Sequence, residues 1–344
     1  MESFKNILVI KSGALGDLIA GTTAIRALRN SYPQASITVL ANSLMQDVCP
    51  PGSLIDNMIV FEPRKGSLGS YLSIFRELRR HRFDLAVNLR WSSEFSTVLT
   101  YGSGAKVRLG SGPKNFRWMY SHRTPLYGER RHEFTRHLDI VRTLGIPAVE
   151  PEPFVYISEE DRRHAKRFFE SVDCSPTSVL LLHPGASTVS KMWMPERFGE
   201  IGRRAIEHFH TNLVVTWGPG EETLAQAVTQ YIGAGASLAP QTTVGRLSAI
   251  IELAGMCVCN YSGVMNIAMA VKTPMVALGC TSPEDWGPYG PLHRTVNSAR
   301  EYDSYTEQER LTAMESIAVE EVWRVVDQRW HELHLPQQGV AVRT

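Results

Sequence analysis

Residues 6–17 read NILVIKSGALGD, and residues 179–191 read VLLLHPGASTVSK. Each stretch begins with an apolar run that is typical of a buried strand and continues into a turn of Gly and small polar residues. Further apolar runs, such as SITVLA at 36–41 and LAVNL at 85–89, alternate with helical patterns. Strands that are apolar on both faces and separated by helices predict parallel sheets covered by helices on both sides.

The alternation of strands and helices restarts after a polar, Pro-containing segment near residues 150–158. A chain of 344 residues has room for two domains of ~150 residues each. We therefore expect an α/β chain of two Rossmann-like domains, residues 1–155 and 156–315, that face each other across a cleft. Residues 316–344 are expected to form a C-terminal helix that packs back toward the first domain.

The composition argues against several classes of protein. Lys and Arg total 36 against 35 Asp and Glu, whereas a dedicated nucleic-acid-binding protein is usually strongly basic. No apolar run approaches the ~18 residues of a membrane span, and we expect no signal peptide. Five cysteines, odd in number and mostly in apolar surroundings, fit a reduced cytoplasm. Cys257 and Cys259 are expected at alternate positions of a buried strand, not in a metal or redox site.

The first turn carries one candidate catalytic residue. Gly13 and Gly16 let the chain turn tightly from a strand into a helix, whose free N-terminal amides suit an anion or a polar ligand. Asp17 follows at the helix start, where its charge either serves catalysis or simply favours the helix. The turn lacks the G-x-G-x-x-G pattern, which argues against an NAD-dependent Rossmann enzyme.

The second turn has the groups that bind phosphate. The hydroxyls of Ser187 and Thr188 can bind phosphate oxygens, and Lys191 adds a positive charge. The alternative is an ordinary loop with a solvated lysine.

Three later turns also lie at the ends of predicted strands. In TWGPGEE, Glu221 or Glu222 can accept hydrogen bonds from ribose hydroxyls, or else supplies a first-turn helix charge. In NYSGVMN, Ser262 and Gly263 begin a helix that offers a second phosphate cradle, unless Ser262 is a plain N-cap. The rigid loop GCTSPEDWGPYG at 279–290 is the fifth turn. Five such turns in two α/β halves predict a cleft that binds a nucleotide.

These segments together resemble glycosyltransferase family nine, the ADP-heptose:lipopolysaccharide heptosyltransferases. The chain matches the family in order and spacing in ILVIKSGALGD, in HPGASTVSKMWMPERF, and in VCNYSGVMNIAMAVKTPMVALGCTSPEDWGPYG. The resemblance implies a GT-B fold, with an acceptor-binding first domain and a nucleotide-sugar-binding second domain. It also implies inversion at the anomeric carbon with no bound metal or cofactor, the nucleotide diphosphate sugar being a co-substrate.

The resemblance assigns roles by position. Asp17 matches the catalytic base, and Lys191 matches the lysine that neutralises the nucleotide diphosphate. The remaining donor-binding positions are Ser187, Thr188, Glu221 or Glu222, Tyr261, Ser262 and Gly263. Two positions depart from the family, which has Asp where this chain has Tyr261 and His where it has Asn266. In the family this Asp contacts the donor, so its replacement by Tyr261 bears on the identity of the donor sugar. ADP-heptose is the leading expectation for the donor, and another nucleotide sugar is the alternative.

The acceptor side is marked by basic residues. Eight Lys and Arg lie between Lys106 and Arg136. They suit a phosphorylated or carboxylated glycolipid, such as lipid A bearing Kdo sugars, or an anionic membrane surface; a solvated loop is the alternative. Gly16, Arg130 and Arg131 are the expected acceptor contacts. A second basic strip, from Arg76 to Arg82, is expected to be solvated.

Chemistry at such a cleft requires both domains. A carboxylate must take the proton of the acceptor hydroxyl, and a cation must stabilise the leaving diphosphate. Since Asp17 and Lys191 come from different domains, domain closure is expected to assemble the site. We expect a cytoplasmic glycosyltransferase, with peripheral contact to the inner face of the cytoplasmic membrane. A same-fold enzyme acting on a small-molecule or protein acceptor, and a non-catalytic nucleotide-sugar-binding protein, are the alternatives.

Overall fold

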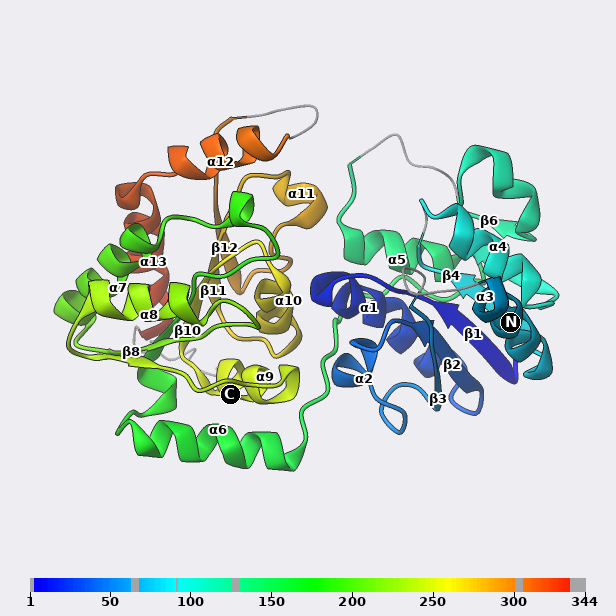
Figure 1. Ribbon diagram of the computed structural model, residues 1–344, viewed down its shortest axis with the longest axis horizontal. Helices are drawn as coiled ribbons and strands as arrows, with labels where there is room; N and C mark the ends of the chain where they lie inside the picture. The colour runs from blue at the N-terminus through cyan, green and yellow to red at the C-terminus, as the bar shows by residue number, and fades with distance from the viewer. Residues whose placement is uncertain (1–2, 63–67, 91, 125–129, 301–305, 335–344) are drawn as a thin grey trace, which may run out of the picture.

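The computed structural model describes residues 3–62, 68–90, 92–124, 130–300 and 306–334. Within these residues the strands form two parallel six-stranded sheets, one in each of two α/β domains that lie side by side (Figure 1). The predicted α/β architecture with two Rossmann-like halves is confirmed.

The first domain holds the sheet with strand order β3-β2-β1-β4-β5-β6. Its strands are β1 (Asn6–Ile10), β2 (Ser36–Ala41), β3 (Asn57–Val60), β4 (Leu85–Asn88), β5 (Val107–Gly110) and β6 (His122–Arg123). Its helices are α1 (Leu15–Ser31), α2 (Met45–Val48), α3 (Leu68–Arg80), α4 (Glu94–Gly102) and α5 (Glu133–Arg142), with the 3-10 helix η2 (Lys114–Met119). The apolar runs that begin at residues 6, 36 and 85 form β1, β2 and β4 as predicted, whereas the more polar β5 and β6 were not predicted.

The second domain holds the sheet with strand order β12-β11-β10-β7-β8-β9. Its strands are β7 (Val179–His183), β8 (Asn212–Val215), β9 (Ala236–Leu238), β10 (Met256–Asn260), β11 (Met275–Gly279) and β12 (His293–Asn297). Its helices are α6 (Glu159–Ser171), α7 (Pro195–Phe209), α8 (Glu222–Ile232), α9 (Val244–Leu253), α10 (Gly263–Ala270), α11 (Pro283–Trp286), α12 (Glu307–Ser316) and α13 (Val319–His334), with the 3-10 helices η3 (Pro176–Ser178) and η4 (Val189–Lys191). Cys257 and Cys259 are fully buried on β10, as expected.

Both sheets have the same topology, counted from the first strand of each domain. The strand order reverses between β1 and β4 in the first sheet and between β7 and β10 in the second. In open parallel sheets ligands bind at this switch point, beyond the carboxyl ends of the strands. The turns after β1, β7 and β10 lie at these two points, and they are three of the turns singled out in the sequence.

The apolar core is continuous between the two domains. One cluster of buried side chains joins a face of each sheet through α1, α5, α9 and α10. A second cluster lies under α7, α8 and α13, and a third under α3 and α4. Helix α13 packs against α7 and β12. The expectation that the C-terminal helix packs back toward the first domain is therefore wrong for residues 319–334, whose apolar side Val322, Val326 and Trp330 covers the second sheet instead.

The connection between the domains is fixed to both of them. The Phe154 amide donates to Thr22 Oγ1 (2.8 Å), and the Tyr156 amide donates to the Val48 carbonyl (2.9 Å), so this stretch follows the first domain. Ser158 then caps α6, which packs against α9 of the second domain (Figure 1).

Two histidines are held neutral inside the second domain. His183 is 3% exposed at the end of β7, with Nδ1 3.1 Å from Thr216 Oγ1. Burial lowers its pKa from 6.5 to about 4. Burial, helped by the nearby charges of Arg329 and Arg294, likewise lowers the pKa of His293 to about 4. An unfolded chain would protonate both at higher pH than the native chain.

We therefore expect stability to be complete above about pH 6.5 and to fall as the pH drops toward 4. Each histidine should cost about 2–3 kcal/mol between pH 7 and pH 4.5. His183→Gln should flatten this dependence, measured as the free energy of urea unfolding at the two pH values, whereas His331→Gln on the exposed side of α13 should leave it unchanged. An equal pH dependence in His183→Gln and the wild type would show that His183 is not the group responsible.

Candidate functional site

A cleft of about 750 Å³ lies between the two domains. The first domain contributes the N-terminal ends of α1 and α5, and the second contributes the turns after β7, β8, β10 and β11. A cavity of this size, at the switch points of two parallel sheets, is large enough for a nucleotide-sized ligand.

The N-terminal ends of α1 and α10 meet at this cleft. A Cβ at Gly16 would lie 2.7 Å from Asn266 Nδ2, and a Cβ at Gly263 would lie 2.8 Å from a methyl carbon of Leu15. Neither glycine leaves room for a side chain, so the two helix ends come as close as backbone allows. Their free amides and positive dipole ends consequently point into the same region.

Asp17 lines the cleft from the first turn of α1. Its Oδ2 accepts a hydrogen bond from the Ala14 amide (3.2 Å), which stabilises the helix start. The carboxylate therefore caps its own helix and also lines the cleft.

A buried charge network lies directly below this turn. Lys11 Nζ is 3.0 Å from His137 Nε2 and 3.8 Å from Glu133 Oε1, and all three side chains are almost fully buried. Burial alone would raise the pKa of Glu133, but the hydrogen bond with His137 and the nearby positive charges lower it to about 2. Burial lowers the Lys11 pKa, and the Glu133 charge opposes that shift. The network joins β1 to α5 beneath the turn that carries Asp17.

The turn after β7, which the sequence predicts to bind phosphate, contributes two of its three predicted residues to the cleft. Ser187 and Lys191 line the cleft, while Thr188 is outside its lining, with its Oγ1 3.2 Å from the buried Ser190 hydroxyl. Lys191 ends η4 and is half-buried.

The turn after β8 resolves the ambiguity between two glutamates. Glu221 lines the cleft, and its Oε2 accepts from the Gly218 amide (2.8 Å). Burial raises the pKa of this carboxyl. Glu222 is exposed at the start of α8, outside the cleft lining, and its Oε1 is 3.4 Å from the Gln226 amide nitrogen. Of the two, Glu221 is placed to meet a ligand.

The turn after β10 forms a cradle at the start of α10. Ser262 is the N-cap residue, but its side chain makes no capping bond. Its Oγ is shielded from solvent and has no hydrogen-bond partner in the described part of the chain. A buried hydroxyl without a partner costs free energy, so a ligand atom that meets it would be stabilising.

Tyr261 lies between this turn and β12. Its hydroxyl is 2.6 Å from Thr295 Oγ1, which itself donates to the Ala277 carbonyl, so the phenol is the donor of the pair. Burial raises the Tyr261 pKa to about 12. The residue also lines the cleft. Since the hydroxyl is engaged with Thr295, the ring is the part of Tyr261 that is free to meet a ligand.

The fifth turn joins the two domains. His132 Nδ1 accepts from the Phe134 amide (3.2 Å), so Nε2 carries the proton and donates to the Gly287 carbonyl (2.8 Å). Burial lowers the His132 pKa, which favours this neutral form. Arg136 pairs with Asp285 at 3.0 Å. This loop therefore fixes the second domain to α5, and its residues Thr281 and Trp286 also line the cleft.

Several cleft residues were not predicted from the sequence. They come from the start of α5, the segment before α9 and one face of α12: His132, Glu133, Phe134, Thr242, Thr243, Arg310 and Met314. No local motif marks these positions, because each reaches the cleft only through the packing of distant elements.

The two arginines expected to contact the acceptor lie outside the cleft lining. Arg130 is exposed and Arg131 pairs with Asp139 at 3.3 Å; neither lines the cleft, although they directly precede His132, which does. Residues 125–129 of the basic segment from Lys106 to Arg136 lie outside the described part.

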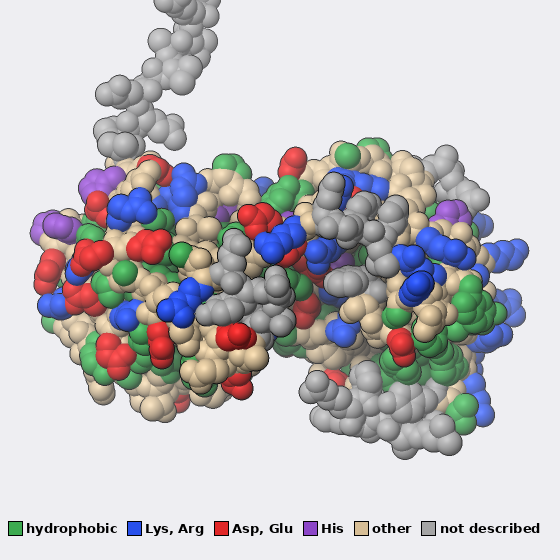
Figure 2. Space-filling model, turned by 90° about the horizontal axis from the view of Figure 1, so that it is seen from above, with side chains coloured by type: hydrophobic (Ala, Val, Ile, Leu, Met, Phe, Trp, Pro, Cys, Tyr) green, Lys and Arg blue, Asp and Glu red, His purple; other side chains and the backbone are tan. Residues whose placement is uncertain are grey.

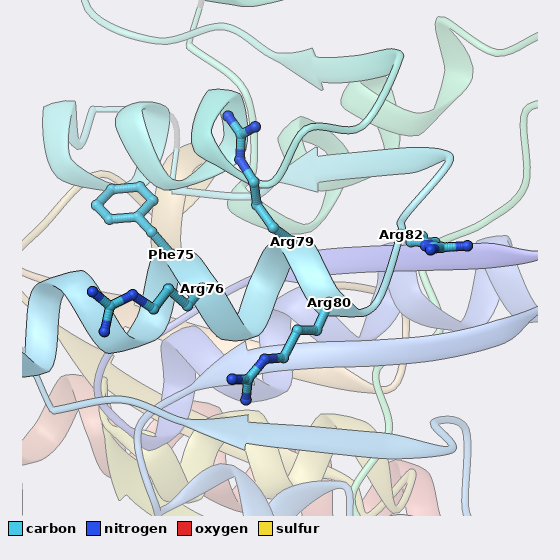
Figure 3. A pocket seen from close by; sticks show the side chains of 5 residues that line it. All are labelled: Phe75, Arg76, Arg79, Arg80 and Arg82. Carbon is cyan, nitrogen blue, oxygen red and sulfur yellow. The ribbon is translucent and has the colours of Figure 1, made fainter.

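The second basic strip has no organised site. Lys and Arg side chains gather at the outer end of the first domain, on the right of Figure 2. The arginines of α3 and the turn after it surround a shallow, open pocket beside Phe75 and point in different directions (Figure 3). Arg79 is held by the Gly102 carbonyl (3.0 Å), while Arg76, Arg80 and Arg82 are exposed, as expected for solvated residues.

Within the described residues, no three His, Cys, Asp or Glu side chains lie close enough to hold a metal ion. Over the same residues, no helix has both the length and the apolar character needed to cross a membrane.

The chain is similar in sequence to one known family of glycosyltransferases. The family described as glycosyltransferase family 9 (heptosyltransferase) matches residues 71–318. The lipopolysaccharide core heptosyltransferase OpsX of Haemophilus influenzae is 25% identical over 307 residues, which cover 86% of this chain and 85% of the relative. Lipopolysaccharide heptosyltransferase 3 of Escherichia coli is 26% identical over 295 residues, 80% of this chain and 82% of the relative.

Solved structures show the same architecture. A family 9 glycosyl transferase from Veillonella parvula superposes with a TM-score of 0.84 at 24% identity, covering 96% of this chain and 99% of that structure. The E. coli ADP-heptose lps heptosyltransferase II gives 0.74 at 20% identity, covering 95% and 99%. The fold is therefore the GT-B fold of these enzymes, and the chain is a glycosyltransferase that belongs to family 9, the heptosyltransferases.

Proposed function

We propose that this enzyme transfers a heptose from ADP-heptose to a hydroxyl of an anionic lipopolysaccharide core acceptor, with inversion at the anomeric carbon. The observation that carries the proposal is the meeting of α1 and α10 at one cleft. It brings a carboxylate of the first domain, Asp17, to the same space as Lys191 and Ser262 of the second. The curated relatives named as lipopolysaccharide heptosyltransferases support heptose and a core acceptor.

The proposed reaction is a single displacement. Asp17 takes the proton of the acceptor hydroxyl as its oxygen attacks the anomeric carbon. The bond from that carbon to the phosphate oxygen breaks on the opposite face, and the electron pair leaves with the nucleoside diphosphate. Lys191 and the N-terminal amides of α10 stabilise the charge that develops there. These groups supply the charge stabilisation, so the proposed reaction requires no bound metal or cofactor.

The acceptor is proposed to enter from the α1 and α5 side. Gly16 lines the cleft beside Asp17, and Arg130 offers an exposed positive charge in the chain segment that enters α5. An acceptor attached to a lipid would hold the enzyme in peripheral contact with the inner face of the cytoplasmic membrane.

Tyr261 is the residue that bears on the choice of donor sugar. Tyr261 stands where the family has a carboxylate, and its hydroxyl is engaged with Thr295. We propose that the ring face packs against the sugar. The same geometry favours, as a second candidate, a different nucleotide sugar whose sugar needs one polar contact fewer.

The direct test is turnover with defined substrates. The purified chain should release ADP from ADP-heptose in the presence of lipid A bearing Kdo sugars, and the acceptor should gain the mass of one heptose. Turnover with a GDP- or UDP-sugar, together with no turnover with ADP-heptose, would show that the donor is a different nucleotide sugar. Absence of turnover across the whole panel, with nucleotide binding retained, would instead favour a non-catalytic binding protein.

Asp17→Asn tests the catalytic base. The amide keeps an oxygen that can accept from the Ala14 amide, so the helix start should survive. It cannot take a proton, and kcat should fall by a factor on the order of 10²–10⁴ while the donor Kd stays nearly unchanged.

Asp47 provides a matched control, because it also lines the cleft, from α2. Asp47→Asn should keep most of the activity. Near-normal turnover in Asp17→Asn, combined with a large loss in Asp47→Asn, would move the base to Asp47.

Tyr261 is tested by two substitutions. Tyr261→Phe removes only the hydroxyl, which is bonded to Thr295, so the ratio of kcat/KM between ADP-heptose and other nucleotide sugars should stay within about twofold. Tyr261→Asp restores the family residue and should change that ratio by about tenfold or more. If the ratio is fixed in both variants and only the Tm falls, Tyr261 is a packing residue without a role in donor choice.

A further inference from the structure

Arg310 is a cleft residue that neither the turns nor the family resemblance accounts for. It lies in the second turn of α12 and lines the cleft together with Met314, one helical turn further on. Among the residues that the structure describes, no carboxylate forms an ion pair with it, and its Nε is shielded from solvent without a hydrogen-bond partner. A half-buried guanidinium in this state has unused hydrogen-bonding capacity.

The acids nearest to Arg310 in sequence do not compensate it. Glu309 accepts from both the amide and the hydroxyl of Thr306, each at 2.7 Å, and so closes the capping box of α12. Glu307 is exposed. Neither acid therefore compensates the Arg310 charge within the described part of the chain.

Packing holds α12 firmly in place. It packs against η4, the short helix that ends with Lys191. At its far end, Trp193 Nε1 and Arg197 both donate to the Ile317 carbonyl, at 3.1 and 2.6 Å. The backbone that carries Arg310 is thus anchored to the same turn that carries Lys191.

The two cations converge on one corner of the cleft. Arg310, Lys191 and Cys280 all line the cleft, and the packing of α12 against η4 brings the two cations to the same side of it. The unpartnered Ser262 hydroxyl and the N-terminus of α10 line the same cleft. Two uncompensated cations repel each other, and an anion with more than one negative charge relieves that repulsion.

We propose that Arg310 is a second cation for the diphosphate of the donor, binding it together with Lys191. A planar guanidinium can bind phosphate oxygens through two parallel hydrogen bonds, which a lysine cannot do. The proposal rests on the proposed function, because it assigns a further residue to the leaving group of that reaction. It predicts that Arg310 acts on the diphosphate and not on the nucleoside.

Calorimetric titrations with whole protein test this assignment. First, a panel of ADP, GDP and UDP identifies which nucleoside diphosphate the wild type binds, and inorganic pyrophosphate is titrated alongside. Arg310→Met should then weaken both that nucleoside diphosphate and pyrophosphate by about 10- to 100-fold. The corresponding nucleoside monophosphate should weaken by less than about threefold. Arg310→Lys should recover part of the loss, and Lys191→Ala should show a loss of similar size.

Arg324→Met is the matched control, because Arg324 is exposed on α13, outside the cleft lining. It should bind every ligand as the wild type does. Equal affinity of Arg310→Met and wild type for the nucleoside diphosphate overturns the assignment of Arg310. Equal weakening of the monophosphate and the diphosphate also overturns it, since general damage to the cleft would act on both. Failure of the wild type to bind any nucleoside diphosphate would reject the proposed function itself.

Discussion

The contact between the N-terminal ends of α1 and α10 is the constraint on which the rest of the site depends. Each parallel sheet offers its ligand position at the switch point, so a reaction between two ligands requires the two switch points to face each other at short range. Gly16 and Gly263 allow this, because a Cβ at either position would overlap the opposite helix. The apolar cluster that continues through this junction then stabilises the arrangement.

Charge is compensated unequally on the two sides of the cleft. In the first domain, Lys11 has Glu133 and His137 as partners, and Arg136 pairs across the junction with Asp285. Breaking a fully buried pair such as Lys11 and Glu133 costs ~3–5 kcal/mol, so this pair serves to hold the turn in place. In the second domain, Lys191 and Arg310 face the cleft without a described carboxylate partner. The positive charge that the proposed diphosphate requires is therefore on the second-domain side.

Local sequence patterns predicted the central strands and the turns that follow them, because β1, β7 and β10 are apolar runs and their turns contain Gly and small polar residues. The edge strands β6 and β12 were missed, since they are short or carry polar residues such as His293 and Arg294. The sequence could not choose between Glu221 and Glu222, because the two residues are adjacent and only the geometry of the helix start decides which side chain faces the cleft. Nor could it find Arg310, whose position depends on the packing of α12 against η4.

Tyr261 joins the second-domain side of the cleft to the contact between the domains. Its ring packs against Gly279, where a Cβ would lie 2.6 Å from the ring carbons, and its hydroxyl lies 3.0 Å from the position of a Cβ at Gly287. The Gly287 carbonyl in turn accepts the hydrogen bond of His132 from the first domain. A small carboxylate at this position would leave the volume between β11 and the 282–287 loop unfilled. The phenol therefore supports the loop that fixes α5 to the second domain, so one side chain couples the lining of the cleft to the contact between the domains.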